Sequence, residues 1–330
     1  MRFAVRTLLT GTLVASCLAP AALAAADAEK TSGAEKKKVV FIAGGPSHGF
    51  GAHDHLAGCN LLADKLKEAK PGYETVVTQG WPKDEKVFEG AGAVVIYADG
   101  GPGHLALPHI RTLDKLSNSG VGIGCIHYAV EVPADQGGEY WVKWMGGHFE
   151  THFSVNPHWV AHFEKFPNHA VSRAVKAFST NDEWYYNMRF REGMEGVTPI
   201  LSAVPPDDTR KGPDGPHSGN DEVRRGVGKN QAEHVLWVSE NESGSRGFGT
   251  TGGHVHWNWA QDDWRKTVLN AVVWIAKGEV PEAGVESKRP TVDEMLANHD
   301  EEVPKDFNRE EMAKRIEEMN KPKDAAAAAK

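Results

Sequence analysis

The chain has little cysteine, no excess of basic residues and few long apolar runs. Each shortage excludes or disfavours one class of protein. Only three of 330 residues are cysteine, so a dense disulfide framework is excluded. Cys59 falls in a predicted helix and Cys125 in a predicted buried strand, and we expect both to be free, buried thiols. The net charge of −8 gives no basis for a nucleic-acid partner, which would favour a basic face.

The N-terminal apolar stretch, residues 7–18, is too short and too rich in alanine to span a membrane well. It follows a positively charged start and precedes small residues at positions 22–24, which is the pattern of a signal peptide. We therefore expect residues 1–24 to be a signal peptide and the protein to be periplasmic or extracellular. Cys17 lies in a lipobox-like segment, which leaves lipoprotein anchoring open. No other segment could cross a bilayer.

The spacing of apolar residues predicts one α/β domain over residues 38–278, after a charged linker at 25–37. Strands are expected at 39–43, 73–77, 93–97 and 121–126, with helices at 55–69 and 108–117. This order is typical of a flavodoxin-like, doubly wound and mainly parallel sheet.

The second half of the domain is less regular. Strands are expected at 199–204, 235–238 and 247–251, an added antiparallel strand at 154–164, short and long helices at 139–145 and 262–277, and a surface loop at 205–232. Residues 279–330 are dominated by proline and charge. We expect a flexible tail there, with one amphipathic helix near 309–319.

Histidine is abundant, with sixteen residues, and many of them stand where loops leave predicted strands. His48, His127, His152 and His254 lie in four such segments, each flanked by glycine or small residues. Ligands of open α/β sheets bind beyond the carboxyl ends of the strands. Imidazoles there are suited to binding metals and moving protons. We expect these segments to form a histidine-walled site.

Within that site, His127, His152 and His254 are the candidate ligands of a divalent metal such as zinc. No nucleotide cofactor is expected. The pair His148 and His152 has the spacing of a zinc-protease helix, but Glu150 is one position too late for that chemistry. His53 and His55 begin a predicted helix, so they are interpreted as capping or surface groups.

Glu183 supplies the carboxylate that such a site usually contains, and Glu183 and His127 are the candidate catalytic pair. The adjacent Asp182 is interpreted as a turn cap. His48 and Asp99 are expected to bind substrate hydroxyls from neighbouring loops.

Aromatic side chains flank these polar groups. Trp184, Tyr185 and Trp257, together with His256, are candidate substrate-binding residues, because sugar rings stack on aromatic faces. Packing in the core is the alternative for two or three of the aromatic residues.

Cys125 is a poor candidate nucleophile. A strand-to-helix nucleophile elbow requires glycine two positions after the nucleophile, and this chain has His127 there.

Five motifs together resemble the ThuA-like family, named for trehalose utilisation. They are residues 39–48, 124–127, 146–152, 182–185 and 252–254. The resemblance implies a class I glutamine amidotransferase-like fold without the amidotransferase cysteine, and a link to sugar metabolism with oxidised (keto) sugars as suggested substrates. The family often has His-Pro where this chain has His169-Ala170, which leaves a role for His169 in doubt.

Two hypotheses follow for function. The first is a sugar-processing enzyme that uses metal-assisted or acid/base chemistry on an oxidised sugar or glycoside. The second is a carbohydrate-binding protein without catalytic activity. Thiol hydrolysis at Cys125 is a third, disfavoured alternative.

Overall fold

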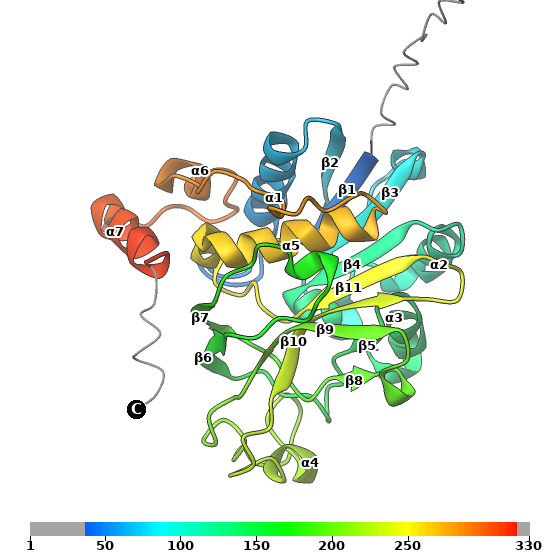
Figure 1. Ribbon diagram of the computed structural model, residues 1–330, viewed down its shortest axis with the longest axis vertical. Helices are drawn as coiled ribbons and strands as arrows, with labels where there is room; N and C mark the ends of the chain where they lie inside the picture. The colour runs from blue at the N-terminus through cyan, green and yellow to red at the C-terminus, as the bar shows by residue number, and fades with distance from the viewer. Residues whose placement is uncertain (1–36, 322–330) are drawn as a thin grey trace, which may run out of the picture. The chain divides into compact units, whose positions relative to one another are not determined.

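The computed structural model describes residues 37–321 (Figure 1). The predicted signal peptide, Cys17 and the linker up to residue 36 lie outside the described residues, as do residues 322–330. Residue 37, expected to end the linker, opens the first strand.

A seven-stranded sheet forms the centre of the domain, in the order β2-β1-β3-β4-β11-β10-β9. Its strands are β1 (Lys37–Ala43), β2 (Tyr73–Gln79), β3 (Ala91–Tyr97), β4 (Gly122–Ile126), β9 (Val197–Ala203), β10 (Glu233–Glu240) and β11 (Arg246–Thr250). Neighbouring strands from β2 to β11 are parallel, and β10 is antiparallel to both β11 and β9. The predicted doubly wound, mainly parallel sheet is confirmed.

Helices cover both faces of this sheet (Figure 1). One face carries α1 (His55–Ala69) and α5 (Asp262–Ile275), and the other carries α2 (Ile110–Asn118) and α3 (Glu139–Met145). A hydrophobic core lies on each face of the sheet, and alternate residues of β1 pack into the two cores. Val39 and Phe41 lie on the α1/α5 side, and Val40 and Ile42 lie on the α2/α3 side. Burial on both faces explains why the strand is a continuous apolar run.

Two small antiparallel pairs lie beside the main sheet, β5 (Gly147–His148) with β8 (Arg189–Phe190) and β6 (His158–Phe163) with β7 (Phe178–Glu183). The added antiparallel strand predicted at 154–164 is β6, whereas β7 was not predicted. Its sequence, FSTNDE, is polar at every position after Phe178 and contains Asn and Asp, which are uncommon in strands. The segment at 205–232 is largely loop and contains the short helix α4 (Asp221–Arg224).

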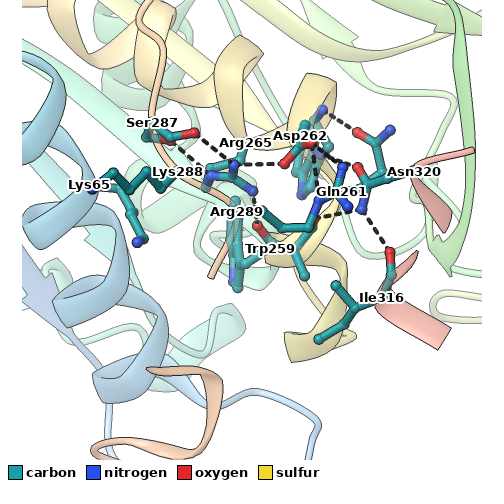
Figure 2. Close-up of polar contacts among 12 residues, drawn as sticks. Lys65, Trp259, Gln261, Asp262, Arg265, Ser287, Lys288, Arg289, Ile316 and Asn320 are labelled. Carbon is teal, nitrogen blue, oxygen red and sulfur yellow. Dashed lines mark hydrogen bonds and ion pairs between the residues drawn. The ribbon is translucent and has the colours of Figure 1, made fainter. Parts of the chain in front are cut away.

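The C-terminal segment differs from the predicted flexible tail over residues 279–321. The helices α6 (Val292–Leu296) and α7 (Arg309–Met319) lie beside α1 and α5 (Figure 1). Met295 and Ile316 are buried. Arg289 pairs with Asp262 of α5 and with Glu317 of α7, and Figure 2 shows its contact with Asp262. These few buried side chains stand among many charged ones in the sequence. The composition of the segment therefore resembles that of a solvated extension, which is why a flexible tail was predicted.

Asn320 completes the attachment of α7. Its side chain accepts a hydrogen bond from the backbone of Asp262 and donates to the carbonyls of Ala260 and Ile316 (Figure 2). Arg265 of α5 in turn donates to Ser287. In the part of the chain that the structure describes, no helix is both long and apolar enough to span a membrane.

Candidate functional site

Four polar side chains meet near the carboxyl ends of the central strands. His127 directly follows β4, His254 lies four residues after β11, Glu183 ends β7, and His53 lies in the loop between β1 and α1. One ligand atom from each lies within 4.8 Å of the others. The predicted meeting of His127, His254 and Glu183 is therefore present in the structure. We call these four residues the tetrad.

The contacts within the tetrad are short. His53 Nε2 lies 3.0 Å from His127 Nε2 and 3.0 Å from His254 Nδ1. Glu183 Oε2 lies 3.1 Å from His254 Nδ1 and 3.5 Å from His127 Nε2. Three imidazoles and one carboxylate thus direct one atom each toward a common point.

The outer nitrogens of two imidazoles have partners that fix their orientation. His127 Nδ1 lies 2.7 Å from the carbonyl of Thr251, and His53 Nδ1 lies 2.8 Å from Asp99 Oδ1. Both partners are acceptors, so each Nδ1 carries the hydrogen and each Nε2 keeps a lone pair. This is how metal-binding histidines are usually held.

The two Nε2 lone pairs then face each other across 3.0 Å, which is unfavourable without a positive charge between them. A divalent cation such as zinc would remove that repulsion. The set of three imidazoles and one carboxylate also matches the ligands that zinc prefers. The residues of the tetrad therefore fit a metal centre in both chemistry and orientation.

Electrostatics keep His53 and Glu183 in the protonation states that bind metals. Burial lowers the pKa of His53 to about 3, although its hydrogen bond to Asp99 opposes the shift. Burial alone would raise the pKa of Asp99, but hydrogen bonds from His53 and Ser47 outweigh it and lower that pKa to about 2. Likewise, the interactions of Glu183 with the neighbouring His127 and His254 side chains outweigh burial and lower the pKa of Glu183. Neutral imidazole and ionised carboxylate are the forms that bind metals.

Glu183 is held through both of its oxygens. Oε1 accepts a hydrogen bond of 3.0 Å from Asn156, and Oε2 lies 3.3 Å from the hydroxyl of Tyr185. That hydroxyl is also 3.1 Å from His127 Nε2. Burial raises the pKa of Tyr185, so the phenol stays protonated and can donate. Tyr185, a predicted site residue, therefore contacts the tetrad directly.

The backbone at two of these histidines is strained. His53 has φ +50° and His127 has φ +57°, in the left-handed region that non-glycine residues rarely occupy. Such residues cluster at functional sites, where surrounding contacts compensate for the strain. His127 lies at the turn that follows β4. Cys125, the residue in the position of a possible nucleophile, lies two residues earlier within the strand.

Exposed groups border the tetrad. The His48 ring lies 3.7 Å from the His53 ring, and the His158 ring 4.8 Å from the His254 ring. Asp99 is 37% exposed. His48 thus lies where a hydroxyl-binding residue was expected, whereas Asp99 has the additional task of orienting His53.

The remaining predicted residues lie elsewhere. His152 is exposed and is not part of the tetrad, so His53 and Glu183 rather than His152 accompany His127 and His254 as candidate ligands. Trp184 is fully buried, donates to the carbonyl of Thr180 and packs against Trp264, and is a core residue.

His256 and Trp257 also face away from the tetrad. His256 donates to the carbonyl of Met295, and Trp257 packs against Phe50 and Phe307. The rule that residues two apart face the same side holds for extended chain. Here a 3-10 helix begins at His256, so His254 and His256 diverge.

His53 is the functional residue that sequence reasoning missed. The start of α1 at His55 was predicted correctly, but His53 precedes the helix and turns toward the sheet. The clustering of three polar residues in His53-Asp54-His55 after a glycine-rich loop was the available signal.

Asp182 lies within β7 and binds a distant loop, so it is not the turn cap that was expected. Its carboxylate accepts hydrogen bonds from the backbone of Gly253 and Val255 and from the side chain of Asn258. It thereby fixes the loop that carries His254. His169 accepts a hydrogen bond from Val171 and packs on Trp274, apart from the tetrad.

Cys125 lies within β4 and is buried, and burial raises the pKa of its thiol. A protonated, inaccessible thiol cannot act as the amidotransferase nucleophile.

Comparisons with known proteins agree with this fold. A family model described as ThuA, trehalose utilisation, matches residues 39–275. A ThuA-like protein from Bacteroides uniformis is 14% identical and has a TM-score of 0.52, covering 73% of this chain and 91% of that one. A ThuA-like protein from Parabacteroides merdae is also 14% identical, with a TM-score of 0.47, covering 83% of this chain and 95% of that one.

A glutamine amidotransferase from Thermotoga maritima is 8% identical, with a TM-score of 0.42, covering 74% of this chain and 99% of that one. Among curated proteins, none matches the chain. The family match spans most of the chain, and the sheet order and the motifs lie within it. The chain belongs to the ThuA family, named for trehalose utilisation.

Proposed function

We propose that the chain is an exported enzyme that processes an oxidised (keto) sugar or glycoside by metal-assisted acid/base chemistry. The convergence of His53, His127, His254 and Glu183 carries the proposal. Membership of a sugar-utilisation family supports the class of substrate.

A divalent cation held by the three imidazoles of the tetrad would polarise the carbonyl of the oxidised sugar, which leaves Glu183 to act as the base. Glu183 would take the proton from the carbon next to that carbonyl. Its lowered pKa keeps it ionised at neutral pH, so it is available to accept a proton and is disfavoured as an acid toward a leaving oxygen.

Other residues would bind and orient the sugar. His48 and Asp99 are exposed enough to meet hydroxyl groups, and the Tyr185 hydroxyl can donate a hydrogen bond at the centre of the site. His53 would be a ligand whose geometry depends on Asp99.

The test is incubation of the purified protein with a panel of 3-keto and unmodified glycosides, followed by mass analysis of the products. We expect turnover of keto substrates by the wild type, a loss of at least about 100-fold in Glu183→Gln, and unchanged turnover in His152→Ala. Sugar binding by both wild type and Glu183→Gln, without turnover by either, would establish the carbohydrate-binding alternative instead.

The metal is tested separately by elemental analysis and chelation. The proposal expects a metal content that falls in His254→Ala but not in His152→Ala, and activity that chelator removes and added zinc restores. Full activity in metal-free protein would remove the metal from the proposal and leave acid/base chemistry by Glu183 alone.

Export is tested by fractionating cells that express the full chain. N-terminal sequencing of the mature protein is expected to show cleavage after residue 24. A lipid-modified form that disappears in Cys17→Ala would show anchoring through Cys17, and a cytoplasmic, uncleaved chain would contradict export.

A further inference from the structure

A second cluster of potential metal ligands lies behind the tetrad. Asp54, His256 and His299 each place one ligand atom within 4.8 Å of the others. They come from three separate segments: the residue before α1, the 3-10 helix after β11, and the loop after α6. Neither the ligands nor the substrate residues of the proposed function include any of the three.

Burial and hydrogen bonding leave this cluster with unpaired acceptors. Asp54 and His299 have side chains 2% and 3% exposed, and His256 is fully buried. Both imidazoles direct Nε2 to the carbonyl of Met295, at 2.8 and 2.9 Å. In the neutral forms, Nδ1 of each therefore carries a lone pair.

Three buried atoms of the cluster have no hydrogen-bond partner, namely Asp54 Oδ2, His256 Nδ1 and His299 Nδ1. Leaving such a buried group unsatisfied destabilises the folded state. A protonated His299 would neutralise Asp54, from which it lies 2.9 Å away, but the lone pair of His256 would remain unpaired. A metal ion is a partner that all three atoms can share.

We propose that Asp54, His256 and His299 bind a second divalent metal ion, which acts as a structural clamp. Two imidazoles and a carboxylate favour zinc or a similar transition metal over calcium and magnesium, which prefer oxygen ligands. Phe50 and Trp257 pack against His299, and this apolar surround would strengthen binding by excluding water.

The clamp would connect the C-terminal segment to the catalytic loops. Asp54 is next to His53, and His256 is two residues from His254. A metal at this second cluster would therefore restrain two loops that carry ligands of the tetrad, together with the segment that follows α6.

The experiment measures metal per full-length chain after stripping with chelator and reloading with Zn²⁺ or Co²⁺. We expect about two equivalents in the wild type, one in His254→Ala, and none in the His254→Ala/His299→Ala double variant. The matched control, His254→Ala/His152→Ala, removes an exposed imidazole and is expected to keep one equivalent.

A second measurement does not depend on folding of the double variant. Reloading His254→Ala with Zn²⁺ at 100 times the dissociation constant is expected to raise Tm by roughly 5 °C, and Co²⁺ should give a visible absorption band. Absence of metal from His254→Ala, or equal metal content with and without His299, would overturn the proposal. One equivalent in both wild type and His254→Ala would instead count against a metal at the tetrad.

Discussion

At the scale of single residues, each imidazole of the tetrad depends on what holds its outer nitrogen. The Asp99 carboxylate orients His53, and the Thr251 carbonyl orients His127. These contacts set the tautomer, and the positive φ of both residues shows that the local backbone is held against its own preference. The chemistry of the site therefore extends to residues that need not touch the substrate.

Replacing Asp99 with asparagine tests this positioning role. We expect Asp99→Asn to weaken metal binding by about 10–100-fold, because the amide no longer enforces the hydrogen on His53 Nδ1. Competition with a chromogenic chelator measures the affinity. Asp135→Asn, at an exposed position of the short π-helix Ala134–Gly138, is the control, and equal affinities of the two variants would contradict the role.

His104 provides a test of acid sensitivity that is separate from both metal clusters. It is buried, lies 3.1 Å from the Ala129 carbonyl through Nε2, and accepts from Ala106 through Nδ1. Burial lowers its pKa from 6.5 to about 4. The unfolded chain therefore takes up this proton at a higher pH than the folded chain, and folding stability falls as the pH drops from 6.5 toward 4.

We expect this single group to remove about 2 kcal/mol of unfolding free energy between pH 7 and roughly pH 4.5. His104→Gln keeps a donor for the Ala129 carbonyl but does not titrate. Between the same two pH values, the unfolding free energy of this variant should therefore fall by about 2 kcal/mol less than that of the wild type. Urea denaturation of both proteins at the two pH values measures the difference. Parallel losses in both would assign the acid sensitivity to other groups.

At the scale of elements, long periodic segments were predictable and short polar ones were not. The bounds of α1 and α3 and the positions of the parallel strands were predicted from apolar spacing, because burial on both faces leaves a strong pattern. β7 was missed because its pairing with β6, rather than its own propensity, stabilises it. The register of that pair places Glu183 opposite His158.

The helix α7 was predicted from its amphipathic spacing, but its packing against the domain was not, since the charged composition around it is typical of a solvated tail. We expect Ile316→Ala to destabilise the protein by about 2–4 kcal/mol, because Ile316 is 4% exposed and its removal leaves a cavity. Lys314→Ala, on the exposed side of the same helix, should change stability by less than about 0.5 kcal/mol. Denaturant titration measures both, and an equal, small effect would mean that α7 contributes little to folding.

At the scale of the whole molecule, the imidazoles of the tetrad gather near the carboxyl ends of the central strands, whereas both described thiols lie within the core. Cys59 and Cys125 are both buried, and burial raises the pKa of each thiol. We expect neither to react with iodoacetamide in the native protein and both to react after denaturation. Peptide mass mapping measures this. Native alkylation of Cys125 with loss of a measured activity would revive thiol catalysis.

The sequence by itself determined the parallel sheet, its helices and the placement of His127 and His254 at strand exits, because these depend on local periodicity and on where strands end. Only the tertiary structure decided that His53 joins them, that His152 does not, and that His256 turns toward His299. Those outcomes depend on backbone turns a few residues long and on contacts between segments up to 201 residues apart. No local sequence pattern predicts these three side-chain positions, because the interactions that stabilise them come from residues distant in the chain.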